Sequence, residues 1–220
     1  SRQAAENLRP AVWVDREWQH SPYVWPSVFD RVLDVYQQRH GLDKSYLIEI
    51  SKKNFSNAKR NPNAQTRGWT LSDENFSDHE TLNPLVTGNI RRHDCGQISD
   101  GAAVVFLANH RAAEKYAKRR GIALRKIPQI KGWGHINAPM EFQTKLALSD
   151  KDPYVFPHVK QLIAQTLMRA GFRDVRDMSG LEAHDCFTIS EYMILDHCGI
   201  FPPGEAWKAI ENGLCEANGN

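Results

Sequence analysis

The sequence predicts an α/β protein, and three observations in the second half of its 220 residues support that fold class. The continuous apolar run 102–108 is typical of a strand buried on both faces, and 122–130 is a second apolar strand candidate. A shorter strand is predicted around 181–183. A helical segment follows each of these strands, and this repeated alternation indicates helices layered on a sheet.

The helices of the second half are predicted from their periodicity and their end signals. Asn109 is expected to cap a helix that runs to Arg120 and is closed by a glycine. Residues 154–170 have the cleanest amphipathic pattern in the chain and are followed by Gly171. The sequence Thr-Ile-Ser-Glu at 188–191 has a capping-box pattern, which predicts the start of a helix that ends at Gly199.

The first half is predicted to be mainly helical. Residues 1–25 are rich in Trp, Pro and Arg and lack a period, so we expect an extended arm on the surface. Helices are expected over 27–41, with Ser27 as the cap, and over 43–61. The short connection between them favours an antiparallel hairpin. The polar segment 63–83 is predicted to be an irregular loop.

Composition excludes several classes of protein. The hydrophobic fraction of 41% and charged fraction of 25% are ordinary for a soluble domain, and a net charge of +2 favours neither nucleic acid nor a membrane as partner. The apolar run 102–108 is far too short to span a bilayer. The four cysteines include no Cys-x-x-Cys pair, which favours reduced thiols and a cytoplasmic location.

The candidate site is the sequence His184-Asp185-Cys186-Phe187, at the predicted passage from a strand to a helix. Backbone N–H groups of a first helical turn are unpaired, and the helix dipole favours a thiolate. Cys186 is therefore expected to have a lowered pKa and to act as nucleophile or acid–base group. His184 would be its proton partner or a hydrogen-bond donor. The alternative is a buried structural cysteine beside a capping Asp185.

A metal site is a competing interpretation that the spacing does not favour. The tripeptide His93-Asp94-Cys95 repeats the candidate site, and His197-Cys198 adds two further possible ligands. Zinc ligands usually have two to four residues between them, and these positions do not match that pattern. We expect no metal site.

Several segments, in order, resemble the thiolase superfamily, and in particular its sterol-carrier-protein type. Residues 99–103 and the apolar run after them resemble a loop and strand of the family, and 122–171 resembles its next strand and helix. The segment 182–187, with His-Asp-Cys-Phe, stands where ordinary thiolases carry Asn-Glu-Ala-Phe. The helical region 27–62 is similar to part of the loop domain over the acyl-CoA pocket. The resemblance covers residues 26–213.

This resemblance implies a partial thiolase fold. Residues 1–88 would form a helical loop or cap region, and 89–220 would form an incomplete α/β layered core, from the end of the N-terminal half to the start of the C-terminal half. The reaction implied is that of acetyl-CoA C-acetyltransferase: Claisen condensation or thiolytic cleavage of acyl-CoA thioesters. The coenzyme A thioester would be the substrate, with no cofactor, and no residue can be assigned to its binding.

The resemblance also implies a role for each residue of the turn. His184 would contribute to an oxyanion hole for the thioester carbonyl. Cys186 would be the acid–base group that moves the α-proton of the acetyl group, and Asp185 would orient the turn through hydrogen bonds.

The family's nucleophilic turn of the Cys-Ser-Thr/Ser-Gly type and its Gly-His-Pro motif have no match in the 220 residues. We therefore expect an internal fragment, inactive as this chain alone and with an aggregation-prone strand at 102–108. Its partners would be an acyl-CoA, and further copies of the chain or complementary thiolase segments. The alternative is a non-catalytic thiolase-like subunit or acyl-CoA-binding module. A hydrolase or reductase has little support, because Gly-x-Ser-x-Gly and Gly-x-Gly-x-x-Gly motifs are missing.

Overall fold

The computed structural model describes residues 2–216 of the chain. In chain order the α-helices are α1 (Arg2–Leu8), α2 (Val24–His40), α3 (Ser45–Arg60), α4 (His110–Arg120), α5 (Phe142–Leu148), α6 (Pro157–Ala170), α7 (Thr188–Cys198) and α8 (Trp207–Glu211). The strands are β1 (Leu85–Thr87) and β2 (Ile90–Arg91). Short helical turns are η1 (Arg9–Ala11), η2 (Val14–Trp18), η3 (Asp73–Phe76), η4 (Arg92–Asp94), η5 (Leu124–Lys126) and η6 (Val175–Asp177).

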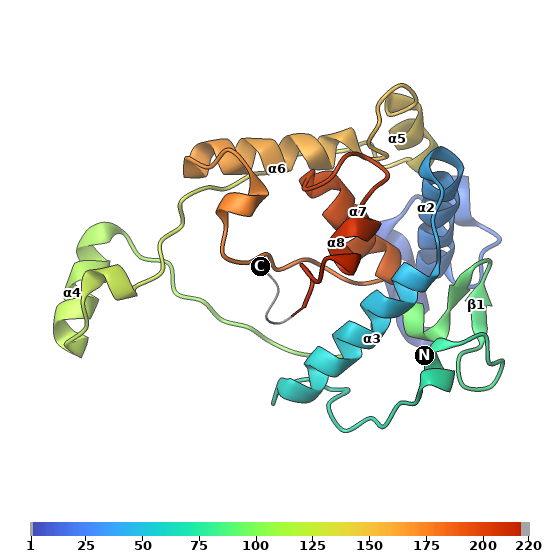
Figure 1. Ribbon diagram of the computed structural model, residues 1–220, viewed down its shortest axis with the longest axis horizontal. Helices are drawn as coiled ribbons and strands as arrows, with labels where there is room; N and C mark the ends of the chain where they lie inside the picture. The colour runs from blue at the N-terminus through green and yellow to red at the C-terminus, as the bar shows by residue number, and fades with distance from the viewer. Residues whose placement is uncertain (1, 217–220) are drawn as a thin grey trace.

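Helix α7 lies at the centre of the molecule and packs against α2, α3 and α6 (Figure 1). Nine of its eleven residues are buried, so it is enclosed on nearly all sides rather than amphipathic. The core joins α7 to the apolar faces of α2, α3 and α8. Fully enclosed members are Leu33, Tyr36, Ile50, Ile189 and Tyr192. Burial of each such aliphatic side chain stabilises the fold by roughly 1.5–3 kcal/mol.

A buried polar cluster fixes α7 against its neighbours. The Tyr36 hydroxyl on α2 donates to Asp196 Oδ1 over 2.9 Å, and the Gly204 amide donates to the same oxygen over 2.7 Å. The adjacent His197 accepts the Phe156 amide at Nε2 over 3.0 Å. These bonds tie α7 to α2, to the start of α6 and to the turn before α8.

The predicted helices are confirmed as α2, α3, α4, α6 and α7, each within a few residues of its expected bounds. Asn109 accepts the Ala112 amide over 2.9 Å as the cap of α4. Gly121 and Gly171 end α4 and α6 with φ angles of 64° and 80°, a region that glycine enters without strain. These end signals are local, which explains why they could be read from the sequence.

Three predictions about the first half and the helix starts are wrong. Residues 2–18 form α1, η1 and η2 instead of an extended arm. The cap of α2 is Tyr23, four residues before the cap expected at Ser27. Helices α2 and α3 diverge from their short connection, because both pack on α7 rather than on each other (Figure 1).

The three strand predictions are also wrong. Residues 102–108, 122–130 and 181–183 are irregular, apart from the turn η5, and the described part of the chain has only the antiparallel hairpin of β1 and β2. A strand requires a partner for its backbone hydrogen bonds, and no described segment lies beside 102–108 to provide one. The hairpin crosses the predicted boundary at residue 88, and the division into two regions stays a prediction.

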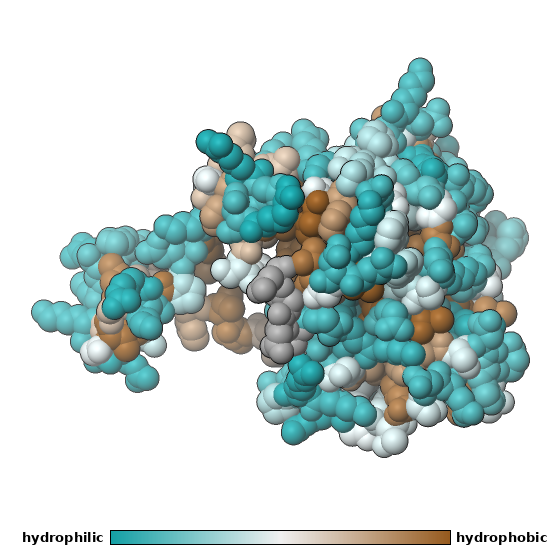
Figure 2. Space-filling model, in the orientation of Figure 1, coloured by the Kyte–Doolittle hydropathy of each residue, from teal (hydrophilic) through white to brown (hydrophobic). Residues whose placement is uncertain are grey.

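The segment 98–131 forms an arm that leaves the helical body and carries α4 at its end (Figure 1). The chain then returns along α6, where Arg169 donates to the Trp133 carbonyl oxygen. Figure 2 shows this arm standing apart, with apolar and polar groups mixed on its surface. Four consecutive apolar residues on it are 78–94% exposed, namely Val104, Val105, Phe106 and Leu107. Within residues 2–216, no helix has both the length and the apolar character that a membrane crossing requires.

Candidate functional site

The fold brings the two His-Asp-Cys tripeptides beside each other. Cys95 lies opposite Phe187 in an antiparallel bridge, and the Gly96 amide donates to the Cys186 carbonyl oxygen over 2.8 Å. A side chain at position 96 would place its Cβ 3.2 Å from the carbonyl oxygens of both Asp185 and Cys186. Glycine at this position therefore permits the close approach of the two segments.

A cavity of about 250 Å³ lies between α3, the segment 93–99 and the start of α7. Its wall includes Asn54, Phe55, His93, Cys95, Asp185 and Thr188. Asp185 lines this cavity, whereas its neighbours His184 and Cys186 do not. Of the three predicted site residues, only Asp185 therefore faces the cavity.

His184 is exposed to solvent at the end of the irregular segment before α7. It is next to a half-buried Asp185, so the imidazole ring lies outside the packed body. Its predicted role in an oxyanion hole stays a prediction.

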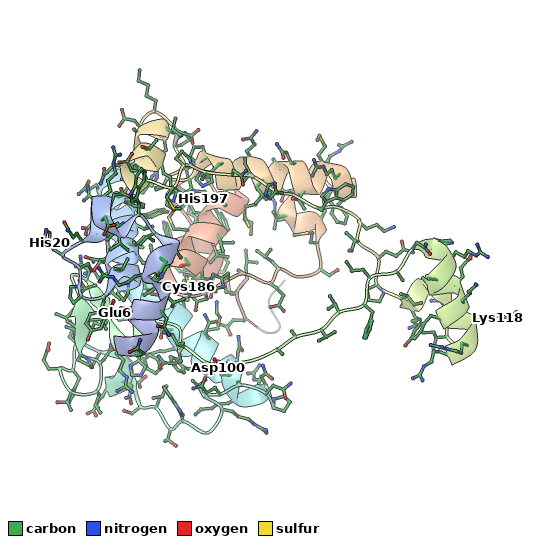
Figure 3. The ribbon with its side chains drawn as sticks, turned by 180° about the vertical axis from the view of Figure 1, so that it is seen from behind. Glu6, His20, Asp100, Lys118, Cys186 and His197 are labelled. Atoms are coloured by element: carbon green, nitrogen blue, oxygen red, sulfur yellow. The ribbon has the colours of Figure 1, made fainter. Side chains whose placement is uncertain are left out.

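Cys186 is half-buried within the helical body, far from Lys118 at the end of the arm (Figure 3). Its Sγ lies 3.3 Å from the Ser190 hydroxyl oxygen. Burial raises the pKa of the Cys186 thiol and outweighs the hydrogen bond with Ser190. The expected lowering of this pKa is therefore wrong, because loss of hydration disfavours the thiolate more than the start of α7 stabilises it.

The start of α7 also differs from the predicted capping box. Phe187 is the cap residue and contributes no side-chain hydrogen bond. The Thr188 hydroxyl instead donates to Asp94 Oδ1 over 3.1 Å. Asp94 Oδ2 accepts the Arg91 amide over 2.9 Å, so both oxygens of this carboxylate have donors. Thr188 therefore ties α7 to the segment that carries the second tripeptide.

Asp185 has the most unusual surroundings of the three predicted residues. Its Oδ2 accepts from the Asn54 carboxamide over 2.5 Å, while Oδ1 is enclosed and has no hydrogen-bond donor. Burial, reinforced by the negative charge of Glu191, raises the pKa of Asp185 to about 6. The carboxyl group therefore titrates between its ordinary range and neutrality, where proton transfer is effective.

The same carboxamide also holds Glu191. Asn54 Nδ2 donates to Glu191 Oε2 over 2.7 Å, and Lys53 forms an ion pair with Glu191 Oε1. The Lys53 and Glu191 side chains are each only 11% exposed. Sequence reasoning missed this group because Asn54 lies 131 positions from Asp185, and nothing local in α3 indicates that contact.

The second tripeptide has a structural environment. His93 is buried against the rings of Phe55 and Phe76, and its amide donates to the Asn83 side chain over 3.0 Å. Burial raises the pKa of the Cys95 thiol to about 12, which keeps it protonated at neutral pH. Among the described residues, no three His, Cys, Asp or Glu side chains form a group that could hold a metal ion.

The segment that carries this site matches a known protein family. Residues 141–220 match the family model described as "Thiolase C-terminal domain-like". The match includes the whole of the turn and α7, and it excludes the arm up to residue 140.

Curated relatives extend the similarity over most of the chain. An acetyl-CoA acetyltransferase of Methanothermobacter thermautotrophicus is 25% identical over 94% of this chain and 49% of its own length. Sterol carrier protein 2 of Gallus gallus is 22% identical over 86% of this chain and 32% of its own length. A benzoylsuccinyl-CoA thiolase subunit of Thauera aromatica is 25% identical over 81% of this chain and 42% of its own length.

The chain thus spans about half the length, or less, of the curated relatives that it matches. The family match at its C-terminal third and these relatives agree with one another and with the predicted resemblance. Residues 141–220 thus resemble the C-terminal domain of thiolases, and most of the chain is similar to members of the thiolase superfamily.

Proposed function

We propose that this chain carries part of the site of a thiolase-type acyl-CoA acyltransferase. The observation that carries the proposal is the position of the His184-Asp185-Cys186 turn, which lies directly before the cap of the central helix α7 and places Asp185 on a cavity wall. A site built at the end of a buried helix is held rigidly by the core. The family relationship supports the thioester chemistry, and the turn supports proton transfer within it.

The roles proposed for the turn follow the resemblance. His184 would donate a hydrogen bond to the thioester carbonyl, and Cys186 would transfer the α-proton. Burial raises the pKa of Cys186 and so opposes loss of the thiol proton. Substrate binding, or closure of the site around the substrate, must therefore supply an interaction that stabilises the thiolate.

Residues 1–220 contain no turn of the Cys-Ser-Thr/Ser-Gly type, which carries the nucleophilic cysteine in thiolase chemistry. The proposal therefore limits this chain to binding an acyl-CoA and transferring a proton. Acyl transfer to a thiol would require a further segment or subunit, either a second copy or a complementary thiolase segment. The layered α/β core and a cytoplasmic location belong to the same proposal.

Exchange of the acetyl methyl protons of acetyl-CoA in D₂O tests this function, because it requires proton transfer and no nucleophile. Mass spectrometry should show deuterium entering the acetyl group in the presence of the chain. The Cys186→Ala variant should reduce the exchange rate at least about tenfold, as expected when a general base is removed. Cys215→Ala removes a thiol that lies outside the His184-Asp185-Cys186 turn and is the control. Equal rates in Cys186→Ala and the control would refute the role of Cys186.

A second candidate is an acyl-CoA-binding module without catalysis. The raised pKa values of Cys95 and Cys186 favour it, because both thiols beside the turn are held protonated. Calorimetric titration with acetyl-CoA distinguishes the two functions. Binding together with exchange supports the transferase, whereas binding without exchange supports the module.

A further inference from the structure

The arm formed by residues 98–131 is strongly basic. It contains eight Lys or Arg residues and two Asp or Glu residues, so its net charge is +6. The chain as a whole contains 28 Lys or Arg and 26 Asp or Glu, which leaves 20 and 24 outside the arm and a net charge of −4 there. The net charge of +2 for the whole chain therefore conceals a separation of charge between the arm and the rest of the molecule.

The eight cations of the arm are not neutralised by carboxylates of the chain. All eight are exposed, and within residues 2–216 none of them forms an ion pair. The carboxylate of Glu114, which lies among them, contacts the His110 ring over 3.2 Å instead. The positive charge of the arm is therefore available to a partner.

Half of these cations lie along one face of α4. Arg111, Lys115 and the pair Lys118 and Arg119 are three or four residues apart, a spacing that brings side chains to the same side of a helix. Ala117 lies on the opposite face and is buried, and α4 packs against η5. Lys118 lies at the end of the arm that is far from the helical body (Figure 3). The four cations thus form a basic face that is exposed to solvent.

An exposed apolar run is separated from α4 by only two residues. It consists of Val104, Val105, Phe106 and Leu107, and its backbone lies in no helix or strand. Peptide groups without partners are excluded from the hydrocarbon core of a bilayer, whereas at its interface water and head groups still bond to them. The run is therefore suited to shallow insertion at an interface.

The combination of cations and apolar side chains distinguishes between kinds of partner. A nucleic acid offers phosphates to the basic face but no apolar phase to the run. A second copy that paired through the run would bring together two arms of charge +6 and leave both basic faces without a counter-charge. The interface of an anionic bilayer offers negative head groups to the basic face and acyl chains to the run.

We propose that the arm binds the surface of a bilayer that contains anionic lipids. In the bound state the basic face of α4 lies on the head groups, and the run 104–107 inserts at their boundary with the acyl chains. Electrostatic attraction and apolar insertion act together, and two such signals are needed for stable attachment to a membrane surface. This inference goes beyond the proposed function and uses none of its steps.

Sedimentation of the full chain with lipid vesicles tests the proposal without any acyl-CoA. The chain should bind vesicles of phosphatidylcholine mixed with phosphatidylserine, and not vesicles of phosphatidylcholine alone. Binding should weaken as sodium chloride is added, because salt screens the attraction between exposed charges. Lack of binding to the mixed vesicles, or equal binding to both kinds, would overturn the proposal.

Replacement of the basic face by neutral residues should weaken binding to the mixed vesicles at least about a hundredfold, because each Lys or Arg near an anionic surface contributes about fivefold. The variant combines Arg111→Gln, Lys115→Gln, Lys118→Gln and Arg119→Gln. Glutamine is a good helix former, so α4 should remain folded, which circular dichroism verifies.

A matched control removes the same number of charges from the body. It combines Lys59→Gln, Arg60→Gln, Arg67→Gln and Lys151→Gln. These cations are exposed and, within residues 2–216, form no ion pair. Their loss should change binding by about twofold or less, because charges far from the membrane are screened. Equal losses in the two variants would show that net charge rather than the basic face controls binding, and would refute the assignment.

Insertion of the run is tested by Phe106→Ala, at a concentration where light scattering shows single copies of the chain. This variant should bind the mixed vesicles about tenfold more weakly, with the salt dependence unchanged. Met168→Ala removes an exposed apolar side chain from α6 and should have no effect. Binding of a duplex DNA that is tighter than binding of the vesicles, and that Phe106→Ala does not change, would assign the basic face to nucleic acid and overturn the lipid partner.

Discussion

Tyr36 shows how strongly a single buried side chain can determine the position of α7. Its hydroxyl donates to Asp196 Oδ1, and both residues are almost completely enclosed. Removal of the hydroxyl leaves that carboxylate with one donor fewer, while its Oδ2 accepts no hydrogen bond and lies 3.4 Å from His197 Nδ1. Because an enclosed acceptor cannot form a replacement hydrogen bond with water, the loss of stability exceeds that caused by removing an exposed hydrogen bond.

Tyr36→Phe should therefore lower the free energy of unfolding by about 1–3 kcal/mol. Urea denaturation followed by circular dichroism measures the change. Tyr46→Phe is the matched control, since the Tyr46 hydroxyl donates to Glu211 at the surface and its loss should change stability by about 0.5 kcal/mol or less. Similar losses in the two variants would contradict the special role of the buried cluster.

Asp185 makes a second prediction at the scale of one residue, because its raised pKa links stability to pH. An acid whose pKa is higher in the folded state binds its proton more tightly there, so it stabilises the fold at low pH. This contribution is present below about pH 4 and is lost as the pH rises through about 6. The loss for Asp185 is on the order of 3 kcal/mol.

Asp185→Asn should remove this loss. Unfolding measured at pH 4.5 and pH 7.5 should reveal a smaller decrease in stability for the variant than for the unmodified chain. Asp94, whose pKa burial also raises, contributes in the same direction and remains in both proteins. The comparison between the two proteins therefore isolates Asp185, and identical pH dependence would count against the raised pKa.

At the scale of elements, the sequence predicts what is determined locally. The cap of α4 and the glycine that ends it directly flank the helix in the sequence, and the amphipathic pattern of α6 lies within the helix itself. Both helices could therefore be recognised from the sequence. The runs 102–108 and 122–130 have strand-like composition, but a strand also depends on a neighbour distant in sequence. The contact of Asn54 with Asp185 and Glu191 is equally distant, so the turn could be predicted while the group that surrounds its carboxyl could not.

The pairing of segment 95–97 with the turn gives a prediction for Gly96. Its missing side chain leaves room for the Asp185 and Cys186 carbonyl oxygens, which an added Cβ would approach to 3.2 Å. Gly96→Ala should push the two segments apart, with a loss of roughly 1–2 kcal/mol in stability. Amide hydrogen exchange at residue 96 should accelerate, because the bond to the Cys186 carbonyl is weakened.

Gly101→Ala is the matched control for this substitution, since nothing lies within 4 Å of a Cβ built there. It should leave both stability and the exchange at residue 96 unchanged. If the two variants behave alike, Gly96 is not required for the close approach of the tripeptides.

At the scale of the whole molecule, the helical body and the arm differ in how their apolar residues are buried. The body encloses α7 and its partners, whereas the arm exposes Val104, Val105, Phe106 and Leu107 in one continuous run. Such a run with unpaired backbone groups is a template for association with another chain. Because the arm contributes little to the core, its association should be separable from folding.

Phe106→Lys should therefore reduce self-association without lowering the free energy of unfolding, since the ring is 94% exposed and loses no packing. Light scattering and the binding of a hydrophobic dye measure the first effect, and urea denaturation measures the second. Met168→Lys is the control, because Met168 is 71% exposed but lies outside the run on α6. Self-association should depend on the charge introduced at residue 106 and not on the one at 168, because only residue 106 lies within a segment that could form a ladder with a second chain. Equal effects of the two substitutions would show that net charge, rather than the exposed run, controls association.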